Sequence, residues 1–493
     1  MDPYLLLALA LYFCAMLAIG LFAFKTNDAS VSGFLLGGRK VGPAVTALSA
    51  GASDMSGWML MGLPGAMYLS GLSSSWIAIG LLIGAWCNYT FVAPRLRTYT
   101  EVTNSLTIPD FLERRFEDNS RILRIVSAMV IITFFAIYTT SGVVGGGKLF
   151  ESAFELPYEL GLYITAGIVV IYTLFGGYLA VSMTDFVQGC IMFVALIMVP
   201  VVAIFELGGS TETSQLIQTA NSEAFNLING VSLLAILSSM AWGLGYFGQP
   251  HIIVRFMAIS SVKDLKVARK IGMSWMLVTL IGALAVGLTG LAYVHKTQLP
   301  LSDPETIFIV LSNTLFHPFI SGFLLAAILA AIMSTVSSQL LVTSSSLATD
   351  LYHEFINKDA PQKQVLLVSR ISIFLVAALA IFIAHDRDSS ILSLVSNAWA
   401  GFGAAFGPLV LFSLFWKKTT RAGAITGMLT GAITVLFWIY APVGPEGATM
   451  SAYLYEIVPG FIVATLSIWL VSLCSQDSSE SMQQDFMSMQ KNL

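Results

Sequence analysis

The residue with the strongest chemical character in the 493-residue chain is Asp54, which lies deep inside the apolar stretch from Thr46 to Trp76. A carboxylate at the centre of a membrane helix costs roughly 2.5 to 3.5 kcal/mol on insertion scales, so it should face a polar cavity. Gly51 and Gly57 flank Asp54 and ease the unwinding of a helical turn, which would expose carbonyl oxygens. Unwound backbone at membrane depth is tolerated only where it lines a cavity. The stretch therefore predicts a site for an ion and a solute at Asp54.

A second interruption is predicted between Ala241 and Pro250, where three glycines and a proline fall inside another apolar run. Glycine frees the backbone and proline removes an N–H donor, so a helix should break here as well. The two interrupted spans are five spans apart and run in opposite directions, which indicates an inverted-repeat transporter with its site between the breaks. The alternative is that the glycines only allow close helix packing.

Small and hydroxyl-bearing residues share one face of a predicted helix in the ninth apolar run. Ala331, Ser334, Thr335 and Ser338 are spaced i, i+3, i+4 and i+7, so they lie on the same side of that helix. Hard cations prefer several oxygen ligands, and two hydroxyls together with unwound carbonyls could supply them to sodium. Such a face is also typical of helix packing, or of hydroxyls bonded to carbonyls one turn back. Beside the two breaks, the cation interpretation is the better one.

Aromatic residues near the predicted breaks could hold a small organic solute. Trp242 and Tyr246 are spaced i, i+4 on the second interrupted span, and Tyr138 precedes a run of small residues in the fourth span. Their rings can enclose an apolar group while their N–H and O–H groups bond a polar one. Asp185 lies near the inner end of the fifth span. It either caps the next helix or lies on the exit path of the ion.

The composition indicates a polytopic membrane protein. Hydrophobic residues make up 56% of the chain, charged residues make up 11%, and the mean hydropathy is +0.81, whereas soluble domains carry about 25% charged residues. A membrane helix needs about 20 apolar residues, and the runs at 43–70 and 318–348 are long enough to be tilted or broken. The sequence predicts thirteen spans, near residues 4–24, 43–70, 73–94, 123–147, 158–180, 185–207, 231–254, 272–294, 318–348, 367–385, 390–416, 422–441 and 453–473.

The lysines and arginines indicate the orientation of these spans, because cytoplasmic loops are enriched in them. With thirteen spans and the N-terminus outside, 21 of the 24 lysines and arginines fall on the inner face, and only Lys148, Lys296 and Arg387 fall on the outer face. One missed span would reverse every later loop, so the count and the orientation support each other. We therefore expect the C-terminal segment from Ser475 to Leu493 in the cytoplasm. The connections leave no room for a folded soluble domain.

Several of these segments resemble the bacterial sodium/proline symporters of the sodium:solute symporter family, over a region from about Phe34 to Gly460. The resemblance implies one transmembrane domain over residues 1–493, with an all-α fold of the LeuT type. Its two inverted five-helix repeats would be residues 43–207 and 231–416, with residues 1–42 and 417–493 at the periphery. The matching segments are Gly37-Gly38-Arg39, Thr46 to Trp58, Met61 to Ala66, Arg121 to Arg124 and Trp242 to Pro250.

The resemblance also implies a function and the residues that carry it. The function would be sodium-coupled uptake of L-proline across the bacterial cytoplasmic (inner) membrane by alternating access, with sodium as coupling ion, no further cofactor, no enzymatic activity and no nucleic-acid partner. Asp54 and Asp185 would support the sodium site. The sodium ligands would be the carbonyls of Ala52, Met55 and Ala331 and the hydroxyls of Ser334 and Thr335, and the substrate contacts would be Ser56, Gly57, Trp58, Tyr138, Trp242, Tyr246 and Pro250.

Three other functions were weighed against this one. A sodium symporter for another solute, such as pantothenate, a sugar or another amino acid, would use the same architecture. An intramembrane aspartyl protease would need Asp54 and Asp185 side by side, but the two are predicted at different depths. A channel would need a ring of charged or carbonyl groups along a continuous pore, which the sequence does not indicate. The oligomeric state stays open.

Overall fold

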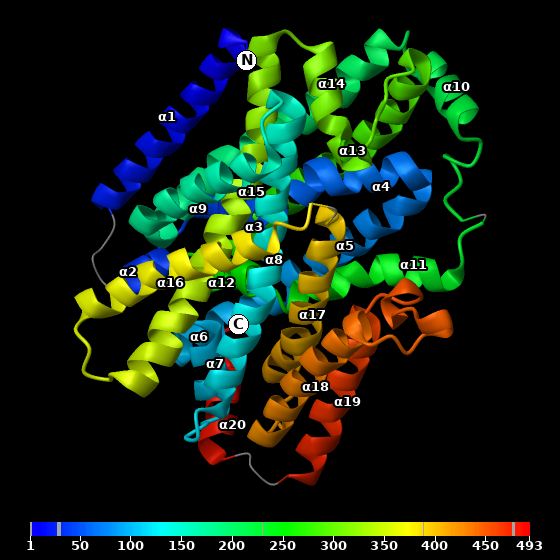
Figure 1. The fold of residues 1–493 in the computed structure, drawn as a ribbon. Helices are drawn as coiled ribbons and strands as arrows, with labels where there is room; N and C mark the ends of the chain where they lie inside the picture. The colour runs from blue at the N-terminus through cyan, green and yellow to red at the C-terminus, as the bar shows by residue number, and fades with distance from the viewer. Residues whose placement is uncertain (1, 27–30, 229, 388, 476–478) are drawn as a thin grey trace.

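The computed structural model describes residues 2–26, 31–228, 230–387, 389–475 and 479–493, and within these ranges it contains helices and no strand (Figure 1). The α-helices are α1 (Pro3–Thr26), α2 (Val31–Leu36), α3 (Pro43–Asp54), α4 (Leu63–Ser70), α5 (Ser75–Cys87), α6 (Ala93–Val102), α7 (Ile108–Arg115), α8 (Ile122–Phe154), α9 (Tyr158–Glu206), α10 (Ser210–Ala220), α11 (Leu233–Met240), α12 (Pro250–Ala258), α13 (Leu265–Thr297), α14 (Ile307–Leu315), α15 (Pro318–Ser345), α16 (Gln362–Ile383), α17 (Ile391–Phe415), α18 (Arg421–Tyr440), α19 (Ile457–Cys474) and α20 (Glu480–Lys491). The shorter 3-10 and π segments are η1 (Gly37–Arg39), η2 (Trp58–Gly62), η3 (Gly71–Ser74), η4 (Asn88–Val92), η5 (Ala241–Phe247), η6 (Pro304–Thr306), η7 (Ser346–Ile356), η8 (Pro445–Gly447) and η9 (Met450–Ala452).

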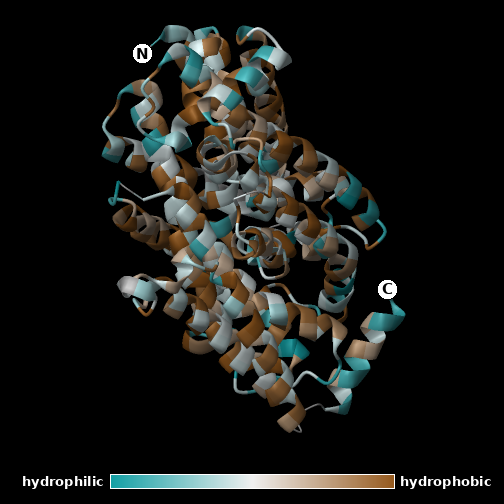
Figure 2. Cartoon of the chain, turned by 90° about the vertical axis from the view of Figure 1, so that its right-hand side faces the viewer, coloured by the Kyte–Doolittle hydropathy of each residue, from teal (hydrophilic) through white to brown (hydrophobic). Residues whose placement is uncertain are grey.

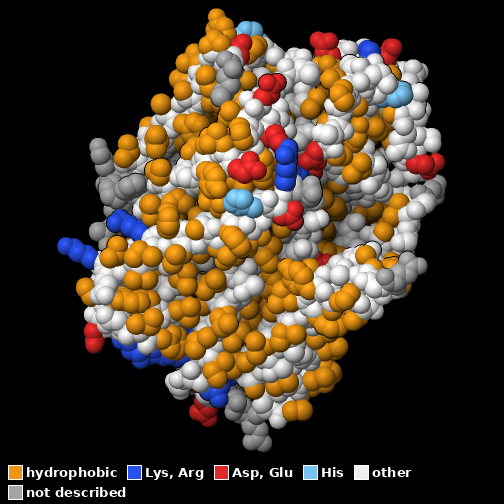
Figure 3. All heavy atoms as spheres, viewed as in Figure 1, with side chains coloured by type: hydrophobic (Ala, Val, Ile, Leu, Met, Phe, Trp, Pro, Cys, Tyr) orange, Lys and Arg blue, Asp and Glu red, His pale blue; other side chains and the backbone are white. Residues whose placement is uncertain are grey.

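The helices have the length and apolarity of membrane spans. Among the described residues, ten helical runs are long and apolar enough to cross a bilayer. Apolar residues dominate these helices, and hydrophilic residues lie mostly in the connections and near the C-terminus (Figure 2). In the view of Figure 3, hydrophobic side chains cover most of the lower half of the molecule. The chain is therefore an all-α polytopic membrane protein, as its composition predicted.

The predicted count of thirteen spans is not reproduced helix by helix. Within the helical run Trp58–Val102, α4 ends before Gly71, whose φ of 62° and ψ of −151° are not helical, so a boundary lies between the two spans predicted there, whereas Tyr158–Ile171 and Leu233–Phe247 are shorter apolar helices. The count and the orientation of the termini therefore stay predictions. The run at 318–348, which was expected to be tilted or broken, is continuous helix from α15 into η7.

The first predicted break is confirmed beside Asp54. Helix α3 starts with a proline at its first turn and ends at Asp54, because Met55 leaves the helical region with φ −86° and ψ 78°. The chain then re-enters helical structure at Trp58, in the π segment η2 that leads into α4. The residues in between expose backbone groups that no longer bond along the helix.

The second predicted break is confirmed between Met240 and Pro250. Helix α11 tightens into the 3-10 segment η5, then Gly248 and Gln249 leave helical geometry, and α12 starts at Pro250. Proline suits that position because its missing N–H would have no partner in the first turn. A further bend lies in α9 at Gly177, whose φ of 58° favours glycine.

Helix α15 forms the centre of the molecule. It packs against α3, α8 and α9, while α1 lies across α9 and α15 on one side. Helices α18 and α19 pack on each other and on α17, on the opposite side of the ribbon from α1 (Figure 1). The first broken segment therefore packs against the central helix through α3.

Glycines let α5 approach the broken segment η5 closely. A Cβ atom on Gly84 would lie 2.6 Å from the Cα of Gly243, and a Cβ on Gly80 would lie 2.7 Å from the Cα of Met240. The neighbouring atoms are backbone, which cannot move aside as a flexible side chain could. Gly243 therefore does both things that were expected of the glycines in this segment: it allows close helix packing, and it lies where the helix is interrupted.

We expect Gly84→Ala to lower the stability of the folded protein by about 1–3 kcal/mol, because the added methyl group would overlap the backbone of Gly243. The measurement is the unfolding temperature of the purified protein in detergent. Gly167→Ala is the matched control, since no atom lies within 4 Å of the position that its Cβ would take on α9. Equal unfolding temperatures for the two variants would contradict the close packing of α5 on η5.

Candidate functional site

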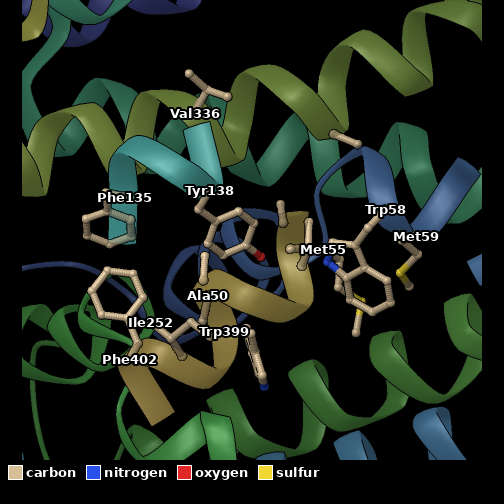
Figure 4. Packing of buried hydrophobic residues seen from close by; sticks show 14 of the residues in the cluster. Ala50, Met55, Trp58, Met59, Phe135, Tyr138, Ile252, Val336, Trp399 and Phe402 are labelled. Carbon is tan, nitrogen blue, oxygen red and sulfur yellow. The ribbon is translucent and has the colours of Figure 1, made fainter. Parts of the chain in front are cut away.

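The two breaks meet at Asp54. The hydroxyl of Tyr246, on η5, donates a hydrogen bond to the Asp54 carboxylate. The backbone carbonyl of Asp54 accepts hydrogen bonds from the indole N–H of Trp58 at 3.1 Å and from the hydroxyl of Tyr138 at 3.2 Å. In Figure 4 the indole nitrogen of Trp58 and the hydroxyl of Tyr138 point toward the break at Met55. The structure therefore brings together four residues that the sequence predicted for this site.

The Asp54 carboxylate is a buried acid without a cationic partner. Only 2% of the residue is exposed, and among the described residues no lysine, arginine or histidine lies within ion-pair distance of it. Its Oδ1 atom has no hydrogen-bond partner. A small cavity of about 20 Å³, enough for about one water molecule, lies beside it, lined by residues that include Gly51, Asn88 and Tyr246. A buried carboxylate needs a compensating cation or proton, so this site attracts positive charge.

Oxygen atoms from α3 and α15 converge at the carbonyl of Ala52, two residues before Asp54. The Ser334 hydroxyl donates to the Ala52 carbonyl at 2.7 Å and to the Ala331 carbonyl at 3.1 Å, and the Thr335 hydroxyl lies 3.3 Å from the Ala52 carbonyl. All four residues are buried. Their oxygens are of the kind that a hard cation prefers. Met55 follows at the break with its sulfur 4.0 Å from the Thr279 hydroxyl, and no contact among the described residues brings its carbonyl into this cluster.

Aromatic rings surround Trp242 on η5. Its ring stacks on Tyr455 at a centroid distance of 5.5 Å and lies 6.1 Å from Trp58. The indole N–H of Trp399 donates to the Trp242 carbonyl at 2.7 Å, and the edge of Tyr246 meets Trp399 at 5.2 Å. Sequence reasoning missed Trp399 and Tyr455. The glycine-rich run after Trp399 was a weak signal for a special segment, but nothing in the sequence marked Tyr455.

A wide hollow of mixed polar and apolar lining leads to this aromatic cluster. Its volume is about 460 Å³, and Trp242, Tyr455, Ser238, Ser396 and Glu456 are among the residues that line it. The hollow joins the start of α11 to the start of α17 and the segment before α19. A solute entering from this side would meet Trp242 before it reached Asp54.

The other predicted substrate residues lie in two places. Ser56 accepts a hydrogen bond from the backbone N–H of Trp58 at 3.4 Å, so it belongs to the first break. Gly57 faces Ile332 on α15, because a Cβ there would lie 3.3 Å from that side chain. Pro250 lines a separate small cavity of about 20 Å³ that it shares with Tyr178 and Arg255. Pro250 therefore does not line the hollow that reaches Trp242.

The side opposite the hollow is closed by arginines. Arg39 donates to the Ser105 carbonyl at 2.6 Å, the Thr100 carbonyl at 2.9 Å and the Met257 carbonyl at 3.0 Å. Ile77 at the hollow and Thr100 at this closure lie at opposite ends of the helical run from α5 to α6. The site is thus reached by a hollow on one side of the protein, and hydrogen bonds from Arg39 close the other side.

Comparison with known proteins agrees with this geometry. A model of the sodium:solute symporter family matches residues 34–431. The chain belongs to the sodium:solute symporter family. Among similar members, the high-affinity proline transporter PutP of Bacillus subtilis (strain 168) is 55% identical over 472 residues, which cover 96% of this chain and 98% of that protein. The osmoregulated proline transporter OpuE of the same organism is 52% identical over 100% of this chain and 99% of its own.

Another family member, sodium/proline symporter 2 of Staphylococcus saprophyticus, is 54% identical over 94% of this chain and 91% of its own. Two solved structures share the fold. A substrate-bound, outward-open Na⁺-coupled sialic acid symporter aligns with a TM-score of 0.82 at 19% identity, over 97% of this chain and 99% of that chain. A nucleobase-cation-symport-1 family transporter aligns with a TM-score of 0.55 at 12% identity, over 92% of this chain and 98% of that chain. The fold of this sodium:solute symporter is therefore of the LeuT type.

Asp185 of this symporter forms a buried ion pair. Its carboxylate lies 3.2 Å from Nη2 of Arg255 on α12 and accepts a hydrogen bond from the Ser49 hydroxyl at 2.7 Å. The Arg255 guanidinium also donates to Ser49 at 3.2 Å and to Ser338 on α15 at 2.5 Å. The pair therefore links α3, α9, α12 and α15 about one helical turn from the oxygen cluster.

This geometry corrects two expectations from the sequence. Asp185 lies eight residues beyond the kink at Gly177, in the interior of the second part of α9, so the interpretation that it caps the next helix is wrong. Arg255, which was counted among the loop cations of the inner face, is 1% exposed inside α12. Its charge neutralises Asp185, whereas Asp54 has no such partner.

We expect Asp185→Asn and Arg255→Gln each to destabilise the protein by about 3–5 kcal/mol, because either one leaves a buried charge alone. The double variant should lose less stability than the two single variants together, since it removes both charges. Unfolding temperatures in detergent give this double-mutant cycle. Glu151→Gln is the control, because it breaks an exposed ion pair with Arg387 and should cost little. Additive losses would show that Asp185 and Arg255 do not act as a pair.

Proposed function

We propose that this symporter couples the inward movement of sodium to the uptake of L-proline across the bacterial cytoplasmic membrane by alternating access. The observation that carries the proposal is the buried Asp54 carboxylate, which has no cationic partner among the described residues. Asp54 ends α3 two residues after Ala52, whose carbonyl belongs to the oxygen cluster, while its own backbone carbonyl binds the aromatic residues Trp58 and Tyr138. Relatives 52–55% identical over nearly the whole chain are named as proline transporters, which supports proline as the solute. A secondary transporter of this kind is not an enzyme.

Sodium would bind between α3 and α15. In the described structure, the Ser334 and Thr335 hydroxyls approach the Ala52 carbonyl. A sodium ion placed among these oxygens would turn the hydroxyls so that their lone pairs face the ion. The carbonyls of Ala331 and Met55 would complete the set, and Asp54 would supply the compensating charge. Asp185, already neutralised by Arg255, would support the site through Ser49 on α3.

Proline would bind between the two breaks. Its compact ring suits an aromatic enclosure by Trp58, Tyr138, Trp242 and Tyr246, which can also interact with the secondary ammonium through their faces. Its carboxylate would meet the backbone N–H groups at the start of η2, beside Ser56 and Gly57, because the N-termini of half-helices favour anions. Pro250 would contribute to the substrate site by its position at the start of α12, because it does not line the hollow.

Sodium and proline binding would be coupled because both solutes would bind at the break that follows α3. Sodium would hold α3 to α15 and so preorganise the backbone that meets proline, and by linkage proline must strengthen sodium binding by the same factor. An inward charge gains about 2.3 kcal/mol per 100 mV of membrane potential, to which the sodium gradient adds. The hollow at Trp242 would be the outer entrance, and the closure by Arg39 would open to release both solutes inside.

This assignment includes the predicted topology. The N-terminus would lie outside and the C-terminus in the cytoplasm. Residues 43–207 and 231–416 would form the two inverted repeats, each starting with one of the broken helices, and residues 1–42 and 417–493 would form the periphery. The protease alternative is disfavoured by the partners of the two acids, because Asp54 binds Tyr246 while Asp185 binds Arg255.

The experiment that tests the proposal is uptake of radiolabelled L-proline into proteoliposomes that contain only the purified protein. We expect accumulation when an inward sodium gradient is imposed and none with potassium in its place. An excess of unlabelled pantothenate, glucose or alanine should leave the uptake unchanged. Uptake that one of these solutes abolishes, or that sodium does not stimulate, would refute the assignment.

We expect Ser334→Ala to raise the sodium concentration for half-maximal uptake by roughly 10- to 100-fold, because a ligand to a charged group contributes about 1.5–3 kcal/mol. Ser337→Ala is the matched control. Its hydroxyl is also buried on α15 but bonds only the Ser334 carbonyl within the same helix. Sodium titrations of proline uptake, normalised to the protein present, give the comparison. The same sodium dependence in both variants would remove Ser334 from the ion site.

A further inference from the structure

An apolar groove lies on the surface of the protein between η4 and the end of α17. Its volume is about 410 Å³, and its lining includes Cys87, Phe91, Phe247, Leu411, Phe412 and Phe415. No charged or amide side chain lines it. It is distinct from the hollow at Trp242 and from the cavity at Asp54, which other residues line.

The position of the groove follows from the packing of η5. This segment packs against both α5 and α17, and Phe247 at its end reaches the groove. Phe247 directly follows Tyr246, whose hydroxyl binds Asp54. A molecule in the groove would therefore contact the broken helix one residue away from the functional site.

Three cations lie at one end of the groove. The Arg95 guanidinium lies 4.4 Å from the ring centre of Phe415 and donates to the Phe91 carbonyl at 3.0 Å. Lys417 and Lys418 are exposed and directly follow Trp416, which caps the end of α17 and lines the groove. In the part of the chain that the structure describes, none of the three forms an ion pair with a carboxylate. Their positive charge is therefore available to an anion.

An apolar groove that ends at unpaired cations is complementary to an anionic phospholipid, which has an apolar acyl chain and a negatively charged headgroup. Basic pockets between membrane helices on the cytoplasmic side bind such headgroups, and 21 of the 24 lysines and arginines, including these three, are predicted to lie on that side. A zwitterionic lipid could place the same kind of acyl chain in the groove. Its headgroup has no net charge, however, so the cations would favour an anionic one.

We propose that this groove binds one acyl chain of an anionic phospholipid, whose headgroup phosphate is held by Arg95, Lys417 and Lys418. The site is selective for headgroup charge and does not require the transport function. It differs in this respect from the general layer of lipid around a membrane protein, which covers apolar side chains without preference for the headgroup.

Native mass spectrometry of the purified protein tests the selectivity, with phosphatidylglycerol and phosphatidylcholine of equal chain length as probes. We expect the wild-type protein to retain phosphatidylglycerol more tightly. Lys417→Gln with Lys418→Gln should weaken this binding by about fivefold for each cation removed. The control removes the same charge at Lys263 and Lys266, two exposed lysines near the start of α13, and should leave the binding unchanged. No preference in the wild-type protein, or an equal loss in both double variants, would overturn the proposal.

A second measurement locates the acyl chain of the bound lipid. Phosphatidylglycerol with a photoreactive group on its acyl chain should crosslink to peptides that contain Phe91, Phe247 and Phe412. Crosslinks of equal yield on the exposed apolar faces of α1 and α18 would show a general lipid layer instead, and would contradict the site. Both readouts are independent of proline uptake, so a failed transport assay would not decide them.

Discussion

The structure depends on the burial of one carboxylate that has no cationic side chain beside it. Asp54 ends helix α3 inside the protein, and its nearest partner is the hydroxyl of Tyr246 from the second broken helix. In a low-dielectric interior such a group is costly unless a cation or a proton compensates it. The Ser334 and Thr335 hydroxyls meet the carbonyl of Ala52, two residues before Asp54 on the same helix. The two breaks, the central helix and the aromatic cluster are all arranged around this uncompensated charge.

The contrast between two of the buried acids, Asp54 and Asp185, separates their roles. Asp185 is held by Arg255 and Ser49, so it keeps its charge balanced when no ion is bound. Asp54 has only neutral partners, so its balance changes when a cation arrives. The two acids lie on different helices but both connect to α3, one through its end and the other through Ser49. An ion that reorganises the end of α3 therefore acts on a helix that a permanent ion pair already positions.

Close backbone contacts make the broken segment a precise part of the structure rather than a loose one. Glycines on α5 and η5 bring main chains together, and Trp399 donates to the Trp242 carbonyl that the break leaves available. Asn88 similarly donates to the Tyr246 carbonyl at 3.0 Å. Each contact satisfies a backbone group that would otherwise be unpaired at membrane depth. The break can thus present side chains to a solute without exposing its own backbone to lipid.

The sequence by itself determined the membrane class, the two breaks and most of the candidate site. These features depend on local properties: runs of apolar residues long enough to cross a bilayer, glycines and prolines that interrupt them, and the helical spacing of Ala331, Ser334 and Thr335. Only the tertiary structure decided the partner of Asp185, the burial of Arg255 and the presence of Tyr455 beside Trp242. Those are contacts between residues that are 70 to more than 200 positions apart. Composition and spacing cannot reveal them, because they arise from the way separate helices pack.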